Sequence, residues 1–470
     1  MKRNVQIANI ILWCLFVVSI AWFKWSYHEM WKDEWQAWFV AKDQSFSEML
    51  SFLNYEGHPL LWYLYLKIWS FVAPFIGSVN ALQLGHLVCV IAVYGILFMI
   101  FDMPIWQKIG IASSYFLLFE YGLVNRGYIL VILILFLIIV KLKNKQTKQF
   151  TIPLLLLLLC QTEVYGVFMA LGILTYQYFS LVDKTRFKRN ALFTFLGLCV
   201  FILTVYPRES GHIAKTQSVN LSGWDQFLTA IQGNLSNTFF IGTTLDTFTY
   251  GYTLIGLLLS VLVLLMLGYI FYENKSSWMA LGLFLLIMIS FSSFIFLGGV
   301  RQWGMVFIFF VAILELTPSN KILSKYKNGA IALLLIFSTV HGVKAMITEY
   351  KIPFSNAKMT GEFLKTNVPE KVPIVTFNKF STTPVIGYLD RKMYSLPDGE
   401  PYSYFRWVDK VYVTTESELR LFTKFKNVKG IIIVSDKPID KNRFPSLMLW
   451  ESFDKENFKK ENYFIYTFKL

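Results

Sequence analysis

Residues 7–23 of the chain, IANIILWCLFVVSIAWF, contain no charged side chain. Directly after them, residues 24–38 read KWSYHEMWKDEWQAW, where acids, bases and tryptophans lie close together. A helix needs about 17–25 mainly apolar residues to cross the hydrocarbon core of a bilayer, and tryptophan is enriched at the edge of that core. The stretch therefore predicts a membrane-spanning helix that ends at Phe23 and a following segment that stays at the membrane surface.

The composition of the whole chain agrees with this interpretation. Of the 470 residues, 55% are hydrophobic and only 16% are charged, whereas a soluble protein has about 25% charged residues. So much apolar surface belongs in lipid, which excludes a soluble enzyme and a disordered chain. The four cysteines lie in apolar runs, which argues against a disulfide scaffold or a metal site and favours small core side chains: Cys14, Cys89, Cys160 and Cys199.

Further apolar runs predict a polytopic protein that is mainly α-helical. By the length rule we expect about eleven transmembrane helices, at Ile7–Phe23, Ala81–Phe101, Ile109–Val124, Tyr128–Leu142, Phe150–Gln161, Val164–Val182, Ala191–Tyr206, Tyr252–Tyr272, Trp278–Leu297, Trp303–Leu316 and Ala330–Ile347. The fifth and tenth are short, so this count could differ by one or two.

The net charge of +14 comes from 44 Lys and Arg against 30 Asp and Glu. In a membrane protein such an excess marks cytoplasmic loops and not nucleic-acid binding. The short basic loops all fall on one side if the count of spans is right: Lys2, Arg3, Lys141, Lys143, Lys145, Lys148, Lys184, Arg186, Lys188, Arg189, Lys321, Lys325 and Lys327. We therefore expect a cytoplasmic N-terminus and an extracytoplasmic C-terminus. Many Lys, Phe and Asn with modest Arg favour a bacterial plasma membrane.

Three segments are expected on the outer side: Lys24–Asn80, Pro207–Asp246 and Lys351–Leu470. The last has the composition of a soluble domain, with helices expected at Ser355–Asn367 and Glu416–Phe425. Its expected strands are Val372–Phe377, Gly430–Val434 and Tyr463–Phe468. We thus predict a membrane domain at residues 1–350, including the loop 24–80, and a small α/β extracytoplasmic domain at 351–470 that caps the substrate or recruits it.

The first outer loop holds apolar residues at helical spacing, which predicts helices lying flat with their apolar face on the lipid: Trp35, Trp38, Phe39, Phe46, Met49, Leu50 and Leu53, followed by the stretch Leu60–Val72. Asp33 and Glu34 open this segment, and carboxylates at a membrane boundary are costly to desolvate. They could simply cap the helix. Glu56-Gly57-His58-Pro59 could likewise be only a turn.

The chain resembles the GT-C glycosyltransferases, in particular the branch related to protein O-mannosyltransferases and bacterial aminoarabinose transferases. The residues that carry this resemblance follow the first span: Asp33-Glu34-Trp35-Gln36-Ala37-Trp38 and Glu56-Gly57-His58-Pro59-Leu60-Leu61-Trp62-Tyr63. The better-known branch often has Lys-Pro-Pro where this chain has Gly57-His58-Pro59. The layout is similar over about residues 1–350, and many members also carry a C-terminal outer domain.

The resemblance implies transfer of a sugar from a polyprenyl-phosphate-linked donor to a hydroxyl or amine of an envelope glycan, lipid or protein, with inversion at the anomeric carbon. Such an acceptor needs a base, for which Asp33 is the candidate beside Glu34. A covalent route would need a second carboxylate as nucleophile, for which Glu56 is the nearby candidate. The departing phosphate needs cations.

Suitable cations are expected on the same outer face. Arg126 lies beside Tyr128 in Asn125-Arg126-Gly127-Tyr128, and Arg301 precedes Gln302 at the start of another span. With Glu56 and His58 these residues are the candidate substrate-binding set, although each arginine could instead bind ordinary lipid headgroups. Glu163 could bind acceptor hydroxyls or form a structural ion pair.

A divalent cation, Mg²⁺ or Mn²⁺, could bridge Asp33, Glu34 and the donor phosphate, although nothing in the sequence requires one. Two other functions stay open. A transporter or flippase of lipid-linked glycans would place charges at the midplane and often show internal repeats, which we do not find. A sensor or assembly protein would use the outer tail to bind a partner.

Overall fold

The computed structural model describes residues 2–144, 148–180, 183–206, 222–240, 251–318, 324–396, 398–407 and 414–469. The chain divides into two compact units. The first consists of Met1–Phe23, Gly57–Trp62 and His86–Ile347, and the second of Lys24–Glu56, Tyr63–Gly85 and Thr348–Leu470. The first outer loop therefore packs mostly with the C-terminal tail, whereas the sequence had placed it with the membrane part.

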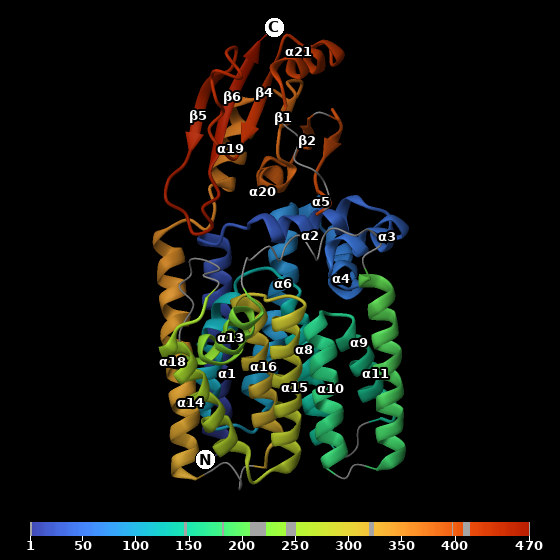
Figure 1. Cartoon of the computed structure of the whole chain (residues 1–470), viewed down its shortest axis with the longest axis vertical. Coiled ribbons are helices and arrows are strands. Elements are labelled where there is room, and N and C mark those ends of the chain that lie inside the picture. Colours follow the sequence, from blue (N-terminus) through green and yellow to red (C-terminus); the bar gives the residue numbers. More distant parts are fainter. Residues whose placement is uncertain are drawn as a thin grey trace. The chain divides into compact units, whose positions relative to one another are not determined.

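The first unit is a bundle of helices (Figure 1). Its elements are α1 (Lys2–Ser26), α6 (Ser78–Gly95), η1 (Ile96–Ile100), α7 (Ile105–Ala112), η2 (Tyr115–Glu120), α8 (Tyr128–Lys143), α9 (Thr151–Cys160), α10 (Val164–Phe179), α11 (Lys184–Val205), α13 (Gly223–Gln232), η3 (Gly233–Asn237), α14 (Leu254–Phe271), α15 (Lys275–Phe294), α16 (Val300–Leu316) and α18 (Lys325–Lys351). The ends of α1, α6 and α18 belong to the second unit.

Among the described residues, six helices are long and apolar enough to cross a membrane: α1, α6 with η1, α11, α14, α15 and α18. The 18 residues of α14 rise about 27 Å, close to the thickness of a bilayer core. The mainly α-helical, polytopic fold class is thus confirmed, and the total of eleven spans stays a prediction. The span expected at Ile109–Val124 is not continuous, because α7 ends at Ala112 and η2 begins at Tyr115.

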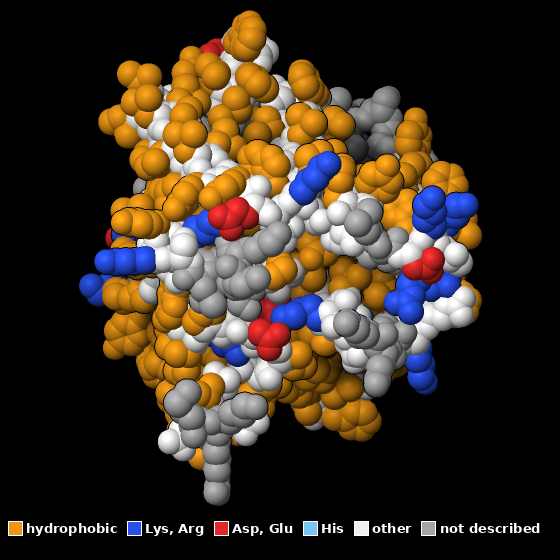
Figure 2. Space-filling model, turned by 90° about the horizontal axis from the view of Figure 1, so that it is seen from below, with side chains coloured by type: hydrophobic (Ala, Val, Ile, Leu, Met, Phe, Trp, Pro, Cys, Tyr) orange, Lys and Arg blue, Asp and Glu red, His pale blue; other side chains and the backbone are white. Residues whose placement is uncertain are grey.

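The bundle has a basic end. In Figure 1, α1, α11, α15 and α18 all begin at the lower end of the bundle. Lys184, Arg186 and Lys188 lie in the first turns of α11, and Lys325 and Lys327 begin α18. Figure 2 shows Lys and Arg side chains among hydrophobic ones on the face seen from below. Of the basic residues expected there, Lys145 and Lys321 lie outside the described residues, as do the side chains of Lys2 and Arg3.

The second unit contains three helices of the first outer loop, α2 (Lys32–Asp43), α3 (Phe46–Glu56) and most of α4 (Leu60–Ser70), followed by α5 (Ala73–Ile76). Its tail contributes α19 (Ala357–Asn367), β1 (Ile374–Thr376), α20 (Lys379–Leu389), β2 (Met393–Ser395), β3 (Pro401–Tyr402), α21 (Glu416–Phe425), β4 (Gly430–Ser435), β5 (Met448–Phe453) and β6 (Tyr463–Lys469). The expected helices and strands of the tail are therefore present, together with α20, β2, β3 and β5, which the sequence analysis missed.

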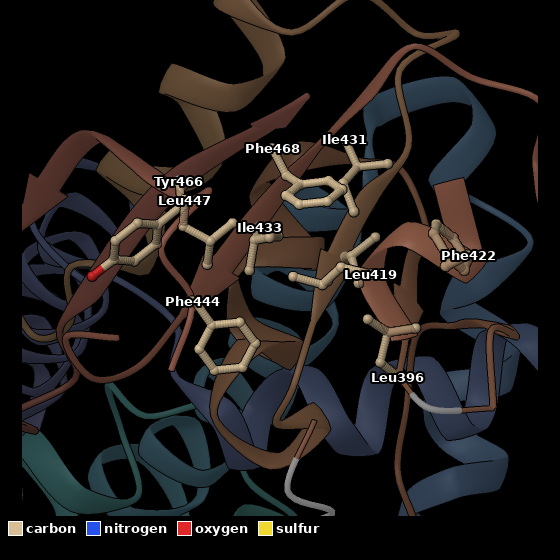
Figure 3. Close-up of a cluster of buried hydrophobic side chains, with 10 residues drawn as sticks. Leu396, Leu419, Phe422, Ile431, Ile433, Phe444, Leu447, Tyr466 and Phe468 are labelled. Carbon is tan, nitrogen blue, oxygen red and sulfur yellow. The ribbon is translucent and has the colours of Figure 1, made fainter. Parts of the chain in front are cut away.

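The strands form one mixed sheet in the order β3-β2-β1-β4-β6-β5. Strand β1 is parallel to β2 and β4, and the other pairs are antiparallel. One side of the sheet is covered by a buried hydrophobic cluster, part of which Figure 3 labels: Leu396, Leu419, Phe422, Ile431, Ile433, Phe444, Leu447, Tyr466 and Phe468. Leu419 and Phe422 come from α21, so this helix packs on the sheet. The small α/β part is confirmed.

Packing of α2 against α20 corrects one expectation. Trp35 and Trp38 are fully buried, and the Trp35 ring lies 5.3 Å from that of Tyr388 on α20. A Cβ added at Gly387 would lie only 2.2 Å from Trp35. The apolar face of α2 is thus covered by protein and does not lie on lipid as predicted.

Candidate active site

The predicted acid pair lies in the first turn of α2. Glu34 caps the start of α2, because its Oε2 accepts the backbone N–H of the N-cap residue Trp31 at 3.0 Å. Asp33 precedes it in the same turn, where the positive end of the helix dipole favours a negative charge. Glu34 is completely buried, whereas Asp33 is partly exposed. Only Asp33 therefore combines a carboxylate with access from outside.

Glu34 belongs to a buried charge network. Its Oε1 lies 3.0 Å from His28 Nε2, and His28 Nδ1 lies 2.5 Å from Glu349 Oε1. The buried Lys24 interacts electrostatically with both carboxylates. Burial alone would lower the pKa of His28, but Glu34 and Glu349 outweigh it and raise that pKa to about 9. The network thus combines two bases and two acids, and it ties α1, α2 and α18 together.

Asp33 has charged neighbours from the end of the chain. Glu461 interacts electrostatically with Asp33, Lys32 and Lys459. Its carboxylate accepts the hydroxyl of Ser355 at 2.7 Å. Although the residue is partly exposed, burial of its carboxyl group raises the pKa of Glu461 to about 7. The surroundings of Asp33 therefore include a second carboxyl group that is half protonated near neutral pH.

Glu56 holds the end of α3 in place. Its two carboxylate oxygens accept the amide of Gln36 at 2.7 Å and the hydroxyl of Tyr63 at 3.0 Å. Gln36 in turn binds both backbone groups of Phe405 in the tail. This buried arrangement fits a structural role for Glu56, which the sequence had suggested as a substrate-binding residue and as the nucleophile of a covalent route.

The residues of the first turn do not fit a divalent cation. Mg²⁺ and Mn²⁺ need several oxygen ligands. The carboxylate of Glu34 is directed at His28 and at the backbone of Trp31, so it does not share a site with Asp33. Among the described residues there is no group of three His, Cys, Asp or Glu side chains arranged to hold a metal ion.

His58 and Glu163 meet in the first unit. His58 Nδ1 lies 2.9 Å from Glu163 Oε2, and the side chain of His58 is 33% exposed against 7% for Glu163. The segment around His58 is fixed because the N–H of Leu61 donates to the carbonyl of Gln161 at 3.1 Å. Glu163 is therefore within hydrogen-bonding distance of a side chain from another segment, that of His58.

Tyr128 connects Arg126 with Gln302. The guanidinium of Arg126 lies over the Tyr128 ring, 5.7 Å from its centre. The Gln302 amide donates to the Tyr128 hydroxyl at 3.1 Å, and its oxygen accepts the N–H of Gly299 to cap α16. Gly127, between Arg126 and Tyr128, lies close to the Trp62 ring, since an added Cβ would be 3.0 Å from it, tighter than most side-chain contacts. Three predicted substrate-binding residues are therefore neighbours.

Arg301 lies beside Glu120. Its Nε is 3.7 Å from Glu120 Oε1, and both side chains are about one-tenth exposed, at 11% and 12%. The other oxygen of Glu120 accepts the Tyr115 hydroxyl at 3.0 Å. The Tyr121 hydroxyl donates to the backbone carbonyl of Arg301 at 2.5 Å. At 3.7 Å the ion pair is longer than a charge-assisted hydrogen bond of about 2.8 Å, so an incoming anion could replace Glu120.

These groups surround one tyrosine. Tyr128 interacts electrostatically with Glu163, Arg126, Arg301 and Glu120. Six predicted substrate-binding residues are thus gathered in the first unit: His58, Arg126, Tyr128, Glu163, Arg301 and Gln302. The predicted Asp33, Glu34 and Glu56 lie in the second.

Sequence reasoning missed several residues of these two groups. Glu461 and Glu349 gave no signal, because single acids in a soluble tail or at a helix end are common. His28 could have been found, since it stands with Lys24 and Glu29 at the same membrane boundary as Asp33. Tyr115 and Tyr121 lie in an aromatic-rich run that offered no reason to select them.

The fold has known counterparts among solved structures. ArnT from Cupriavidus metallidurans bound to undecaprenyl phosphate superposes with a TM-score of 0.54 at 9% identity, covering 97% of this chain and 97% of that chain. Its apo structure gives a TM-score of 0.54 at 11% identity, covering 97% and 98%. No family model and no curated protein matches the sequence.

At such low identity, this likeness concerns the fold. The chain is thus a multi-pass membrane protein with an ArnT-like fold, and the resemblance predicted from the first outer loop is confirmed at that level.

Proposed function

We propose that this chain is a membrane glycosyltransferase that moves a sugar from a polyprenyl-phosphate-linked donor to an acceptor in the cell envelope. The observation that carries the proposal is the ArnT-like fold. The match covers 97% of this chain and 97% of the ArnT chain, whose structure was solved with undecaprenyl phosphate. Two residue groups of this chain supply the chemistry that such a transfer needs.

The arginine group of the first unit suits the lipid phosphate. Arg126 and Arg301 are neighbours of Tyr128, and guanidinium groups bind phosphate through two parallel hydrogen bonds. As the bond between the sugar and the phosphate breaks, negative charge grows on the leaving oxygen, and fixed cations stabilise it. His58 adds a third donor at the partly exposed edge of this group.

Asp33 is the proposed general base. An acceptor hydroxyl or amine loses its proton to the Asp33 carboxylate while its oxygen or nitrogen bonds to the anomeric carbon. The polyprenyl phosphate leaves with the electron pair of the broken carbon–oxygen bond. Glu34 has a different task in this proposal: by capping α2 and binding His28 it holds the turn that presents Asp33.

A single displacement inverts the anomeric carbon. A retaining route needs a second carboxylate as nucleophile, and Glu56, the earlier candidate, uses both oxygens for Gln36 and Tyr63. Direct displacement is therefore the simpler chemistry. The proposed location is a bacterial plasma membrane with a cytoplasmic N-terminus, because the basic end of the bundle suits the cytoplasm.

The test is Asp33→Asn in membrane vesicles supplied with a polyprenyl-phosphate sugar and an envelope acceptor. A positioned base contributes about 10²–10⁴-fold to such a step, so we expect at least a hundredfold loss of transfer. Asp454→Asn removes an exposed carboxylate of the same unit and serves as the matched control. Transfer by Asp33→Asn at the wild-type rate would remove Asp33 from the mechanism.

A further inference from the structure

The second unit contains a cavity of about 290 Å³ that the proposed transfer chemistry does not use. It lies beside β2 and β3, and its wall includes three cations and three hydroxyl-bearing side chains: Lys379, Lys392, Arg406, Tyr402, Ser403 and Tyr404. The volume is at the lower end of the range for small-molecule sites. One sugar residue with a charged substituent is therefore a suitable occupant by size.

The cations come from three separate segments. Lys379 begins α20, Lys392 directly precedes β2, and Arg406 follows β3. Lys379 is held in place, since its Nζ lies 2.9 Å from Asp398 and 5.9 Å from the centre of the Tyr402 ring. Lys392 is exposed. Cations from three neighbouring segments thus converge on one cavity, which suits an anion.

The wall after β3 is rigidly built. Arg406 lies over the Tyr55 ring, 5.0 Å from its centre, and Tyr404 packs edge-on against Phe52 at 5.2 Å. Both backbone groups of Phe405 are bound to Gln36. The contacts with the first outer loop thus fix the segment that presents Arg406. This wall of the cavity is therefore formed without a ligand.

The charge balance favours an anion. Two carboxylates bind to this wall: Asp398 pairs with Lys379, and Asp43 accepts the Ser403 hydroxyl at 2.5 Å. Among the residues that the structure describes, three cations against these two acids leave a net positive site. The tyrosine rings and hydroxyls add what a sugar ring needs, namely apolar faces for its C–H groups and polar partners for its hydroxyls.

We propose that this cavity binds an anionic sugar, that is, a sugar residue carrying a phosphate or a carboxylate. Such binding does not depend on the transferase chemistry. The further statement that the bound sugar is part of the envelope acceptor depends on the proposed function.

The test measures binding of small sugars to the full chain in detergent by calorimetry. The probes are glucose 6-phosphate, glucuronate, glucose and glycerol 3-phosphate. We expect at least one charged sugar to bind about tenfold more tightly than glucose, and to bind more weakly as salt rises. Glucose 6-phosphate and glucuronate distinguish phosphate from carboxylate as the recognised group.

Equal binding of glucose overturns the proposal, because the charge is then not recognised. Equal binding of glycerol 3-phosphate overturns it as well, because a simple lipid headgroup then suffices and the sugar ring plays no part. Absence of binding by both charged sugars has the same consequence.

Variants locate the site. Arg406→Gln and Lys392→Gln each remove one cation and should weaken binding of the charged sugar about tenfold. Lys365→Gln removes an exposed lysine of α19 outside the cavity and should leave binding unchanged. Equal weakening by all three variants would show only a general charge effect and would overturn the assignment. If Arg406→Gln unfolds, Lys392→Gln still decides.

Asp33→Asn separates this inference from the proposed function, because it should abolish transfer and retain sugar binding. Normal transfer by Asp33→Asn with intact binding would remove Asp33 from the mechanism and leave the site. Absence of transfer by the wild-type chain, with intact binding, would overturn the function and leave the site. Lost transfer, together with binding that the cavity variants do not change, would overturn the site alone.

Discussion

Arg301 is held by a long ion pair with Glu120, and its proposed contribution to donor binding can be tested. Its Nε stands 3.7 Å from Glu120, so exchange of that carboxylate for a donor phosphate loses little. We expect Arg301→Gln, and equally Arg126→Gln, to lower kcat/KM for the lipid-linked donor about ten- to a hundredfold, through a higher KM from the lost phosphate contact and a lower kcat from the lost stabilisation of the leaving group. Steady-state transfer assays at varied donor concentration measure this.

The matched control for the arginine variants is Arg186→Gln. Arg186 is an exposed residue of the same unit, in the first turn of α11. Its removal should leave the donor KM unchanged. A KM that rises equally in all three variants would indicate a general effect of membrane charge and contradict the assigned phosphate contact.

Glu461 gives the stability of the chain a pH dependence. Burial raises its pKa to about 7, from 4.5, although the Ser355 hydroxyl and Lys32 act in the opposite direction. The folded chain therefore binds this proton more tightly than the unfolded chain does. The stabilisation is complete below about pH 4.5 and is lost as the pH rises through about 7.

Glu461→Gln keeps the shape and the oxygen that accepts Ser355 but never ionises. We expect this variant to match the wild type at pH 5 and to be more stable at pH 8 by about 1–3 kcal/mol. Thermal unfolding in detergent at both pH values measures it. The exposed Glu451→Gln should keep the wild-type pH profile. Equal stability of Glu461→Gln and the wild type at pH 8 would contradict the raised pKa.

Single residues differed in how far the sequence could predict them. Asp33 was selected because a carboxylate at the edge of an apolar run is costly to desolvate and so demands a reason. Arg126 and Arg301 were selected because short outer loops hold few basic residues, and His58 because its segment resembles a family motif. Partners could not be predicted in the same way. Acceptor binding or a structural ion pair was considered for Glu163, but its neighbour His58, more than a hundred residues away, was not predicted, because no local pattern encodes which helix ends meet.

At the scale of the element, the contact between α2 and α20 depends on one glycine. The Trp35 ring packs so closely on Gly387 that a Cβ added to this glycine would lie only 2.2 Å from the ring. We expect Gly387→Ala to force these helices apart and to destabilise the fold by about 1–3 kcal/mol. The thermal midpoint in detergent measures this.

Gly282→Ala is the control for that substitution. Gly282 lies in α15 with no atom within 4 Å of an added Cβ. The change should be neutral or slightly stabilising, since alanine favours helix by up to about 1 kcal/mol over glycine. If Gly387→Ala and Gly282→Ala changed the thermal midpoint by the same small amount, the close approach of Trp35 to Gly387 would not limit the packing of α2 on α20.

The sequence predicted most elements and missed those whose patterns are weak. Strands β1, β4 and β6 are apolar and buried, so they were expected. Helix α20 contains Pro384 and four Ser, Thr or Gly residues, which obscure a helical pattern. Strand β5 is mostly exposed and lacks an apolar face. The break between α7 and η2 was missed because hydropathy does not distinguish a continuous helix from an interrupted one.

At the scale of the whole molecule, the grouping of segments was the hardest feature to predict. Gln36 of the first outer loop binds Phe405, 369 residues further along the chain. The tryptophans of α2 were expected to lie on lipid, because an amphipathic helix looks the same whether lipid or protein covers its apolar face. Only the tertiary contacts show that the tail covers it.

Orientation in the membrane is the prediction that concerns the whole chain. The basic residues at the start of α11 and α18 favour the cytoplasm. The predicted odd number of spans would place the tail on the other side of the membrane. Cysteines introduced by Lys188→Cys and Lys455→Cys test this, after the four native cysteines are replaced. In intact cells a membrane-impermeant maleimide should label the cysteine at position 455 and not the one at 188, and permeabilised cells should show both. Labelling of the cysteine at position 188 alone in intact cells would indicate the reverse orientation. The proposed donor and acceptor would then have to be sought on the cytoplasmic side.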